Sequence, residues 1–150
     1  MPDVPPEVAI KATIRPGSVY YFRHESFINS EFPHYFIVIN LDPISEEVIL
    51  LVSSTSRPYK VQQRRLNCPK KTLVEVTPAQ YPDFPLTSII DCNNVIDTET
   101  IDSLINRRAN KELEMKTAMA IELVEQLREG VLASPVVTGK IKAQLRAKTD

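Results

Sequence analysis

Along the first two thirds of the chain, apolar residues gather in short runs that turn-forming residues separate. The runs are rich in β-branched and aromatic side chains, as sheet strands are. They cover residues 19–23, 35–40, 47–53, 72–77 and 87–92. No helical period interrupts them, so the pattern predicts five strands of an antiparallel sheet.

From about residue 98 the apolar positions recur at helical spacing instead. A short helix is expected after a cap at Asp97 or Thr98, and a longer one over residues 111–132, with Gly130 and Pro135 marking its end. The apolar stripe of the long helix, which most simply faces the core or a second subunit, consists of Leu113, Ala120, Ile121, Val124, Leu127 and Val131. Strands first and helices second predict an α+β, mainly β fold: a small antiparallel barrel or rolled sheet with a C-terminal amphipathic helix.

A chain of 150 residues suits a single domain with one core. Residues 1–13 are expected to form an extended arm, because their prolines remove donors and disfavour helix. The barrel and its C-terminal helices then occupy residues 14–132. Residues 133–150 form a basic tail, which docks on its own protein, binds a partner or stays mobile.

Composition excludes several classes of protein. The 18 Lys and Arg nearly balance the 19 Asp and Glu, so the net charge is not that of a protein that coats nucleic acid or binds a membrane surface with its whole surface. No apolar run approaches the roughly 18 residues of a membrane span, and residues 1–15 lack the apolar centre of a secretory signal. We therefore expect a cytoplasmic protein without a membrane partner. Two cysteines, Cys68 and Cys92, are too few for a zinc cage and are expected to be reduced, so neither a metal nor another cofactor is expected.

The charges are nevertheless unevenly distributed. Residues 57–71 contain no acid and six cations, which are Arg57, Lys60, Arg64, Arg65, Lys70 and Lys71. Residues 72–106 contain acids but no Lys or Arg. A loop with this many cations, together with Tyr59, suits phosphate contacts and base stacking. The alternative is a solvated loop whose charges only maintain solubility.

The strand before this basic loop ends in four consecutive hydroxyl residues, Ser53, Ser54, Thr55 and Ser56. Hydroxyls at a strand end commonly satisfy the local backbone in a turn. Here they directly precede cations, so neutral and charged donors lie together where a phosphate could bind.

The order of these motifs resembles the MazF/PemK toxin family, sequence-selective endoribonucleases of toxin-antitoxin modules. The resemblance spans roughly residues 14–106 and lies in the stretches RPGSVYYF, FPHYFIVIN, ILLVSSTS and TSIIDCNNVIDTETID. It implies an SH3-like barrel of the MazF/PemK/CcdB type and a homodimer. It also implies metal-independent cleavage of single-stranded RNA, by attack of a ribose 2′-hydroxyl on the adjacent phosphate, and inhibition by a cognate antitoxin protein.

Carried over residue by residue, the resemblance puts the family's catalytic Thr at Ser53, with Ser54 beside it, and its catalytic Arg at His34. Asp91 and Asn93 fall near the Asp and Arg that act in some members. Histidine is only partly cationic near neutral pH, unlike Arg, but it can serve as the acid or base while Ser53 donates to the developing charge. The alternative is that His34 is an ordinary loop histidine.

Two sets of candidate residues follow. The catalytic candidates are His34, Ser53, Ser54 and Asp91. The RNA-binding candidates are Arg23, His24, Thr55, Arg57, Lys60, Arg64, Arg65 and Asn93. Arg23 and His24 follow the first strand and could supply the positive charge that the family's Arg would provide. Two alternatives to the ribonuclease remain open: a catalytically degenerate barrel that binds RNA or protein, and a structural protein whose basic loop and tail engage an acidic partner.

Overall fold

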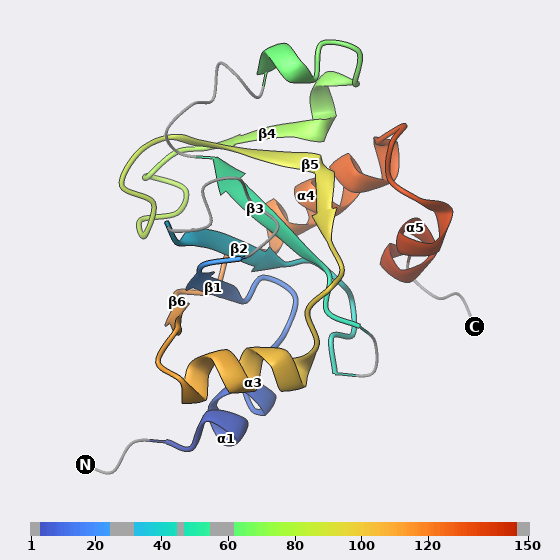
Figure 1. Ribbon diagram of the computed structural model, residues 1–150. Coiled ribbons are helices and arrows are strands. Elements are labelled where there is room, and N and C mark those ends of the chain that lie inside the picture. The colour runs from blue at the N-terminus through green and yellow to red at the C-terminus, as the bar shows by residue number, and fades with distance from the viewer. Residues whose placement is uncertain (1–3, 25–31, 45–46, 55–61, 147–150) are drawn as a thin grey trace.

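The computed structural model describes residues 4–24, 32–44, 47–54 and 62–146, with residues 50–54 described by their backbone alone. Its centre is a six-stranded antiparallel sheet in the order β4-β5-β3-β2-β1-β6 (Figure 1). The strands are β1 (Val19–Phe22), β2 (His34–Val38), β3 (Leu50–Ser54), β4 (Leu73–Val76), β5 (Ser88–Ile96) and β6 (Leu113–Lys116).

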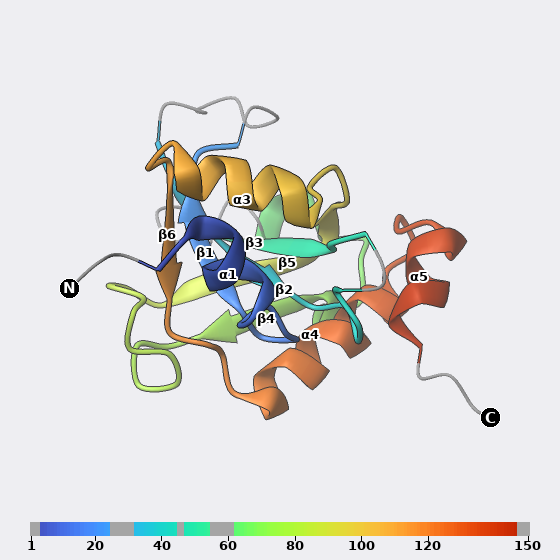
Figure 2. The same cartoon turned by 90° about the horizontal axis from the view of Figure 1, so that it is seen from below.

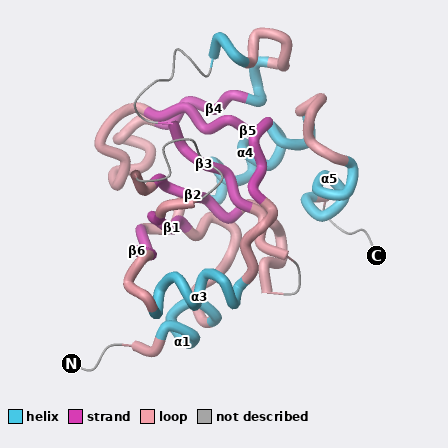
Figure 3. The backbone as a smooth tube through the Cα atoms, viewed as in Figure 1, coloured by secondary structure: helices cyan, strands magenta, loops and turns pink. Residues whose placement is uncertain are grey.

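Helices lie on both sides of the strands (Figure 3). Besides helical residues 62–64, they are α1 (Pro6–Lys11), α3 (Ile101–Ala109), α4 (Ile121–Ala133), α5 (Gly139–Leu145) and the 3-10 helix η1 (Lys70–Thr72). Figure 2 shows α1 beside α3, and the strands between α3 and α4. Among the described residues, no helix combines the length and apolar character that a membrane crossing requires.

The strand β2 shows why its sequence is apolar at almost every position. Side chains alternate between the faces of a strand. Phe36 and Val38 enter the cluster that includes side chains of α1 and α3, whereas Ile37 enters the cluster formed with α4 and α5. All three side chains are fully buried. A sheet covered on both faces therefore has strands without the polar alternation of a half-exposed sheet.

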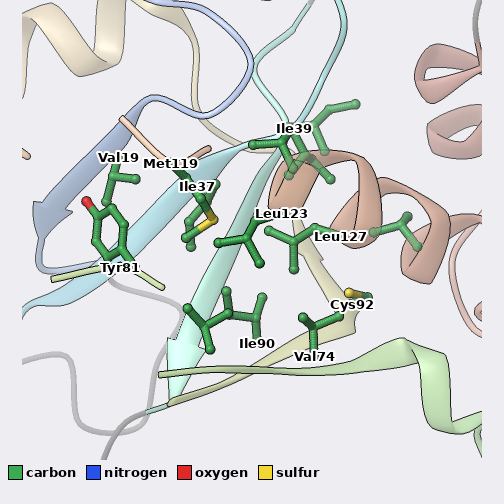
Figure 4. Packing of buried hydrophobic residues seen from close by; sticks show 14 of the residues in the cluster. Val19, Ile37, Ile39, Val74, Tyr81, Ile90, Cys92, Met119, Leu123 and Leu127 are labelled. Atoms are coloured by element: carbon green, nitrogen blue, oxygen red, sulfur yellow. The ribbon is translucent and has the colours of Figure 1, made fainter. Parts of the chain in front are cut away.

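The larger cluster lies between the sheet and α4 (Figure 4). Leu123 and Leu127 of α4 pack there among strand residues such as Ile37 and Ile90. The helix approaches β5 closely at Gly130, where a Cβ atom would lie 2.7 Å from the Cys92 Sγ. The predicted end of this helix near residue 132 is confirmed, since α4 ends at Ala133. Gly130 lies inside the helix, where it provides room for packing.

The extended arm predicted for residues 1–13 is wrong over residues 6–11, which form α1. Pro6 occupies the first turn of this helix, where an N–H group has no helical acceptor and proline is tolerated. Ile10 anchors the helix and is fully buried. At the other end of the chain, Ile141 and Leu145 of α5 are buried in the α4 cluster, so this part of the basic tail docks on its own protein.

The long helix predicted from residue 111 is wrong over its first part, because residues 113–116 form β6 and pair with β1. Leu113 is buried in the cluster under α3, not on the stripe of α4. Tertiary pairing therefore overrides local helical spacing in β6.

The cap predicted at Asp97 or Thr98 is also wrong. Thr100 caps α3 instead, because its Oγ1 accepts a hydrogen bond from the Ser103 N–H at 3.0 Å.

The antiparallel α+β fold with a helix packed on the sheet is as predicted from the sequence. The strands β4 and β6 are the two edges of the sheet, and the described residues do not pair them with each other. Closure into an SH3-like barrel is therefore not shown.

Candidate functional site

The ends of several strands meet at one end of the sheet. Because neighbouring strands are antiparallel, β1 ends beside the start of β2, and the register pairs Phe22 with His34. The strand β3 ends beside the start of β5, where Ser54 pairs with Ile89. The last residue of β3 and the first residue of β2 lie at the same end of these adjacent strands. This strand-end site contains Arg23, His24, His34 and the backbone of Ser53 and Ser54.

His34 is half-buried at the start of β2. Burial lowers the pKa of its imidazole, and a hydrogen bond with the Phe32 backbone raises the pKa to a smaller extent. A histidine with a lowered pKa is mostly neutral near pH 7, so it can accept a proton. The ring therefore has the protonation state that a general base requires.

A pocket of about 420 Å³ opens beside His24, within the usual size of small-ligand sites. Its lining residues combine cations, carboxylates and an aromatic ring, and they are Tyr21, Arg23, His24, Pro33, Arg107, Lys111, Glu112 and Glu114. Pro33 immediately precedes His34, so the pocket adjoins the strand-end site.

A buried ion-pair cluster fixes the wall of this pocket. The Glu99 side chain is 5% exposed, and its Oε1 accepts a hydrogen bond from the Arg107 Nε at 2.7 Å. Arg107 also donates to the Arg23 carbonyl oxygen at 2.9 Å. The His24 Nε2 lies 3.7 Å from the Glu99 Oε2 and 3.2 Å from the Thr98 Oγ1. These contacts connect the exit of β1 to α3 and hold His24 in place.

Asp91 and Asn93 belong to a second polar network on β5. Asp91 follows Ile90, the partner of Ser53, and its Oδ2 accepts a hydrogen bond from the Arg65 Nε at 2.9 Å. Its Oδ1 accepts from the Asn93 backbone N–H at 3.0 Å and from the Asn93 Nδ2 at 2.9 Å. Asp91 and Asn93 are 6% and 7% exposed. Both side chains therefore bind protein groups, next to the strand-end site.

Four of the predicted RNA-binding residues remain, and the structure describes only one of them. Arg64 is exposed beside Arg65. Thr55, Arg57 and Lys60 lie outside the described residues.

Sequence reasoning missed Arg107 and Glu99, which contact the exit of β1. No local pattern signals this contact, because Arg107 lies 84 positions from its partner Arg23. Lys111 also lines the pocket, and its φ of 60° is rare for a residue other than glycine. Within the described residues, no group of three or more His, Cys, Asp or Glu side chains could hold a metal ion.

Comparison with known proteins found no model of a protein family and no curated protein that matches the chain. Function must therefore be inferred from the side chains themselves.

Proposed function

We propose that this protein is a toxin-like endoribonuclease of the cytoplasm that cleaves single-stranded RNA without a metal ion. A homodimer and inhibition by a cognate antitoxin are part of the proposal. The observation that carries it is the position of His34, whose pKa is lowered, at the sheet end that also holds Arg23 and the hydroxyl-rich end of β3. A base, cations and hydroxyl donors are the groups that phosphodiester transesterification requires.

In this mechanism the neutral His34 removes the proton of a ribose 2′-hydroxyl. The 2′-oxygen forms a bond to the adjacent phosphorus, and the bond from phosphorus to the 5′-oxygen breaks. The His34 imidazolium then returns the proton to the leaving 5′-oxygen, which gives a 2′,3′-cyclic phosphate and a free 5′-hydroxyl. The hydroxyl-rich end of β3 is proposed to donate to the phosphoryl oxygens, and Arg23 balances their charge.

The cations of residues 62–71 are proposed to bind the RNA backbone on either side of the cleaved bond. Single-stranded RNA suits such a site because its bases and 2′-hydroxyls are accessible. Each phosphate contact contributes a slope of about −0.7 in log K against log salt for single strands. Binding is therefore expected to weaken steeply with salt.

The test is incubation of single-stranded RNA with the wild type and with His34→Ala, in chelator. His34→Ala is expected to lower the cleavage rate by about 10²- to 10⁴-fold, the usual contribution of general acid-base catalysis, with little change in RNA affinity. The wild-type kcat/KM is expected to rise with pH through a midpoint below 6.5, because burial lowers the pKa of His34. Lys140→Ala, an exposed change on α5, is the control.

Cyclic phosphate ends on the products would support the chemistry. The proposal fails if the wild type leaves varied RNAs intact, or if His34→Ala cleaves as fast as the wild type.

A binding module without catalysis is the second candidate. It is favoured by the engagement of Asp91 with Arg65 and of His24 with Glu99, which leaves two of the titratable candidates bound to protein groups. This candidate predicts salt-dependent RNA binding, no cleavage and no effect of His34→Ala beyond a modest loss of affinity.

A further inference from the structure

Residues 62–71, here called the basic segment, are attached to β5 at two places. Near the start of the segment, the Arg65 Nε donates to the Asp91 Oδ2 at 2.9 Å. Just after its end, the Thr72 Oγ1 accepts from the Asn93 Nδ2 at 3.0 Å. Asp91 and Asn93 are themselves hydrogen-bonded, so one network holds both ends of the segment. Figure 1 shows this green segment adjoining β4, the edge strand next to β5.

The attached groups are buried, whereas the other cations of the segment are exposed. Asp91, Asn93 and Thr72 are between 0% and 7% exposed. Arg64, Lys70 and Lys71 are exposed, and no ion pair within the described part of the chain engages them. A buried carboxylate thus fixes one cation, and the neighbouring cations face solvent.

We propose that Asp91 and Asn93 are positioning residues for RNA binding, which hold the basic segment on β5 so that its exposed cations form a pre-ordered phosphate-binding ridge. The proposal deepens the proposed function and rests on it. A ridge ordered before binding avoids the entropic cost of ordering a long cationic loop around the RNA. The ridge adjoins the strand-end site, because Asp91 follows the partner residue of Ser53.

The proposal predicts that neutralising Asp91 changes RNA affinity in the direction opposite to that expected from charge alone. Neutralising an acid ordinarily strengthens the binding of a polyanion, because it removes repulsion. If Asp91 positions the ridge, Asp91→Asn weakens RNA binding instead, by about tenfold, since a charge-assisted hydrogen bond is lost. Glu75→Gln neutralises an exposed acid on the neighbouring strand β4 and is the matched control. Its RNA affinity is expected to equal or slightly exceed that of the wild type.

A second pair of variants separates position from charge. Arg64→Gln and Arg65→Gln each remove one positive charge from adjacent residues, but only Arg65 contacts Asp91. Arg64→Gln is expected to reduce the magnitude of the slope of log K against log salt by about 0.7, the value of one phosphate contact. Arg65→Gln is expected to reduce this magnitude by about twice as much or more, because the remaining cations lose their fixed position. Equal effects of the two variants, or tighter binding by Asp91→Asn, would overturn the proposal.

Limited trypsin digestion without RNA tests the attachment independently of the proposed function. Asp91→Asn and Arg65→Gln are expected to be cut about tenfold faster after Arg64 and Lys70 than the wild type, with the sheet still folded by circular dichroism. Unchanged digestion contradicts the attachment even if the wild type binds RNA. If the wild type binds no RNA at low salt, the proposed function fails, and the ridge fails with it, whereas faster digestion still establishes the attachment. If Asp91→Asn does not fold, Arg65→Gln decides the question. The Arg65 side chain is 28% exposed, so its replacement disturbs the core less than a change at buried Asp91.

Discussion

Replacing Gly130 by alanine is expected to destabilise the protein, although alanine is the better helix former. In an open helix interior this change is worth about 1 kcal/mol in favour of alanine. At Gly130 the new Cβ would lie 2.7 Å from the Cys92 Sγ and 2.8 Å from the Lys71 carbonyl oxygen, well inside the 3.4 Å at which ordinary contact begins. Overpacking of a core costs about 1–3 kcal/mol, and the upper half of that range applies because one overlapping atom belongs to the backbone. The net loss is therefore about 1–2 kcal/mol.

Urea and thermal unfolding followed by circular dichroism measure this loss. The midpoint temperature is expected to fall by about 2–8 °C, since 1 kcal/mol corresponds to roughly 2–4 °C in a chain of this length. Gly139→Ala is the matched control, because a Cβ at Gly139 meets nothing within 4 Å at the start of α5. The double variant with Cys92→Ala is expected to recover only part of the loss, since the overlap with the Lys71 carbonyl remains. A Gly130→Ala protein as stable as the wild type would refute this account of the packing.

Two further predictions concern buried and partly buried charges. Arg107→Met leaves the Glu99 carboxylate buried without the guanidinium that pairs with it. We expect this variant to lower the free energy of unfolding by about 3 kcal/mol. Lys140→Met, a change at an exposed residue, is the control and is expected to have little effect. The backbone N–H of Thr117 donates to Asp83 and is the main cause that lowers the pKa of this carboxyl. A lowered pKa means that the stabilisation is present above the unfolded pKa near 3.8 and is lost as the pH falls through the folded value, which lies below 3.8. Asp83→Asn is therefore expected to flatten the pH dependence of stability below about pH 3.8, as measured by urea unfolding. An unaltered acid profile would show that this hydrogen bond is not the source.

The strand prediction succeeded where sequence and burial agree. The run that became β2 is apolar because both of its faces are covered, and β-branched and aromatic side chains suit such a strand. The short strand β6 could not be predicted in this way. Leu113 and Met115 alternate as strand residues do, but Leu113 also fits the helical spacing of the residues that follow, and only the distant pairing with β1 decides between them.

The candidate site was predictable to a similar degree. The grouping of His34 with Ser53 came from the order of strands and from a family resemblance, and the register places both at strand ends. The partners of Asp91 were not predictable, because nothing in the sequence indicates which of six cations would reach it. The role of Glu99 was not predictable either, because its contacts with Arg107 and His24 depend on how α3 packs against β1.

The pairing of β1 with β6 also has a consequence for the biosynthesis of the chain. Phe22 pairs with Leu113, so the outer partner of β1 is synthesised about ninety residues after β1 itself. The helix α4, which contributes Leu123, Val124, Leu127 and Val131 to the larger apolar cluster, follows β6 and ends at Ala133. Contacts so distant in sequence form slowly, and nascent chains fold from the N-terminus as they emerge. A nascent chain from which α4 has not yet emerged would leave that apolar face uncovered, so this fold forms only after Ala133 has been synthesised.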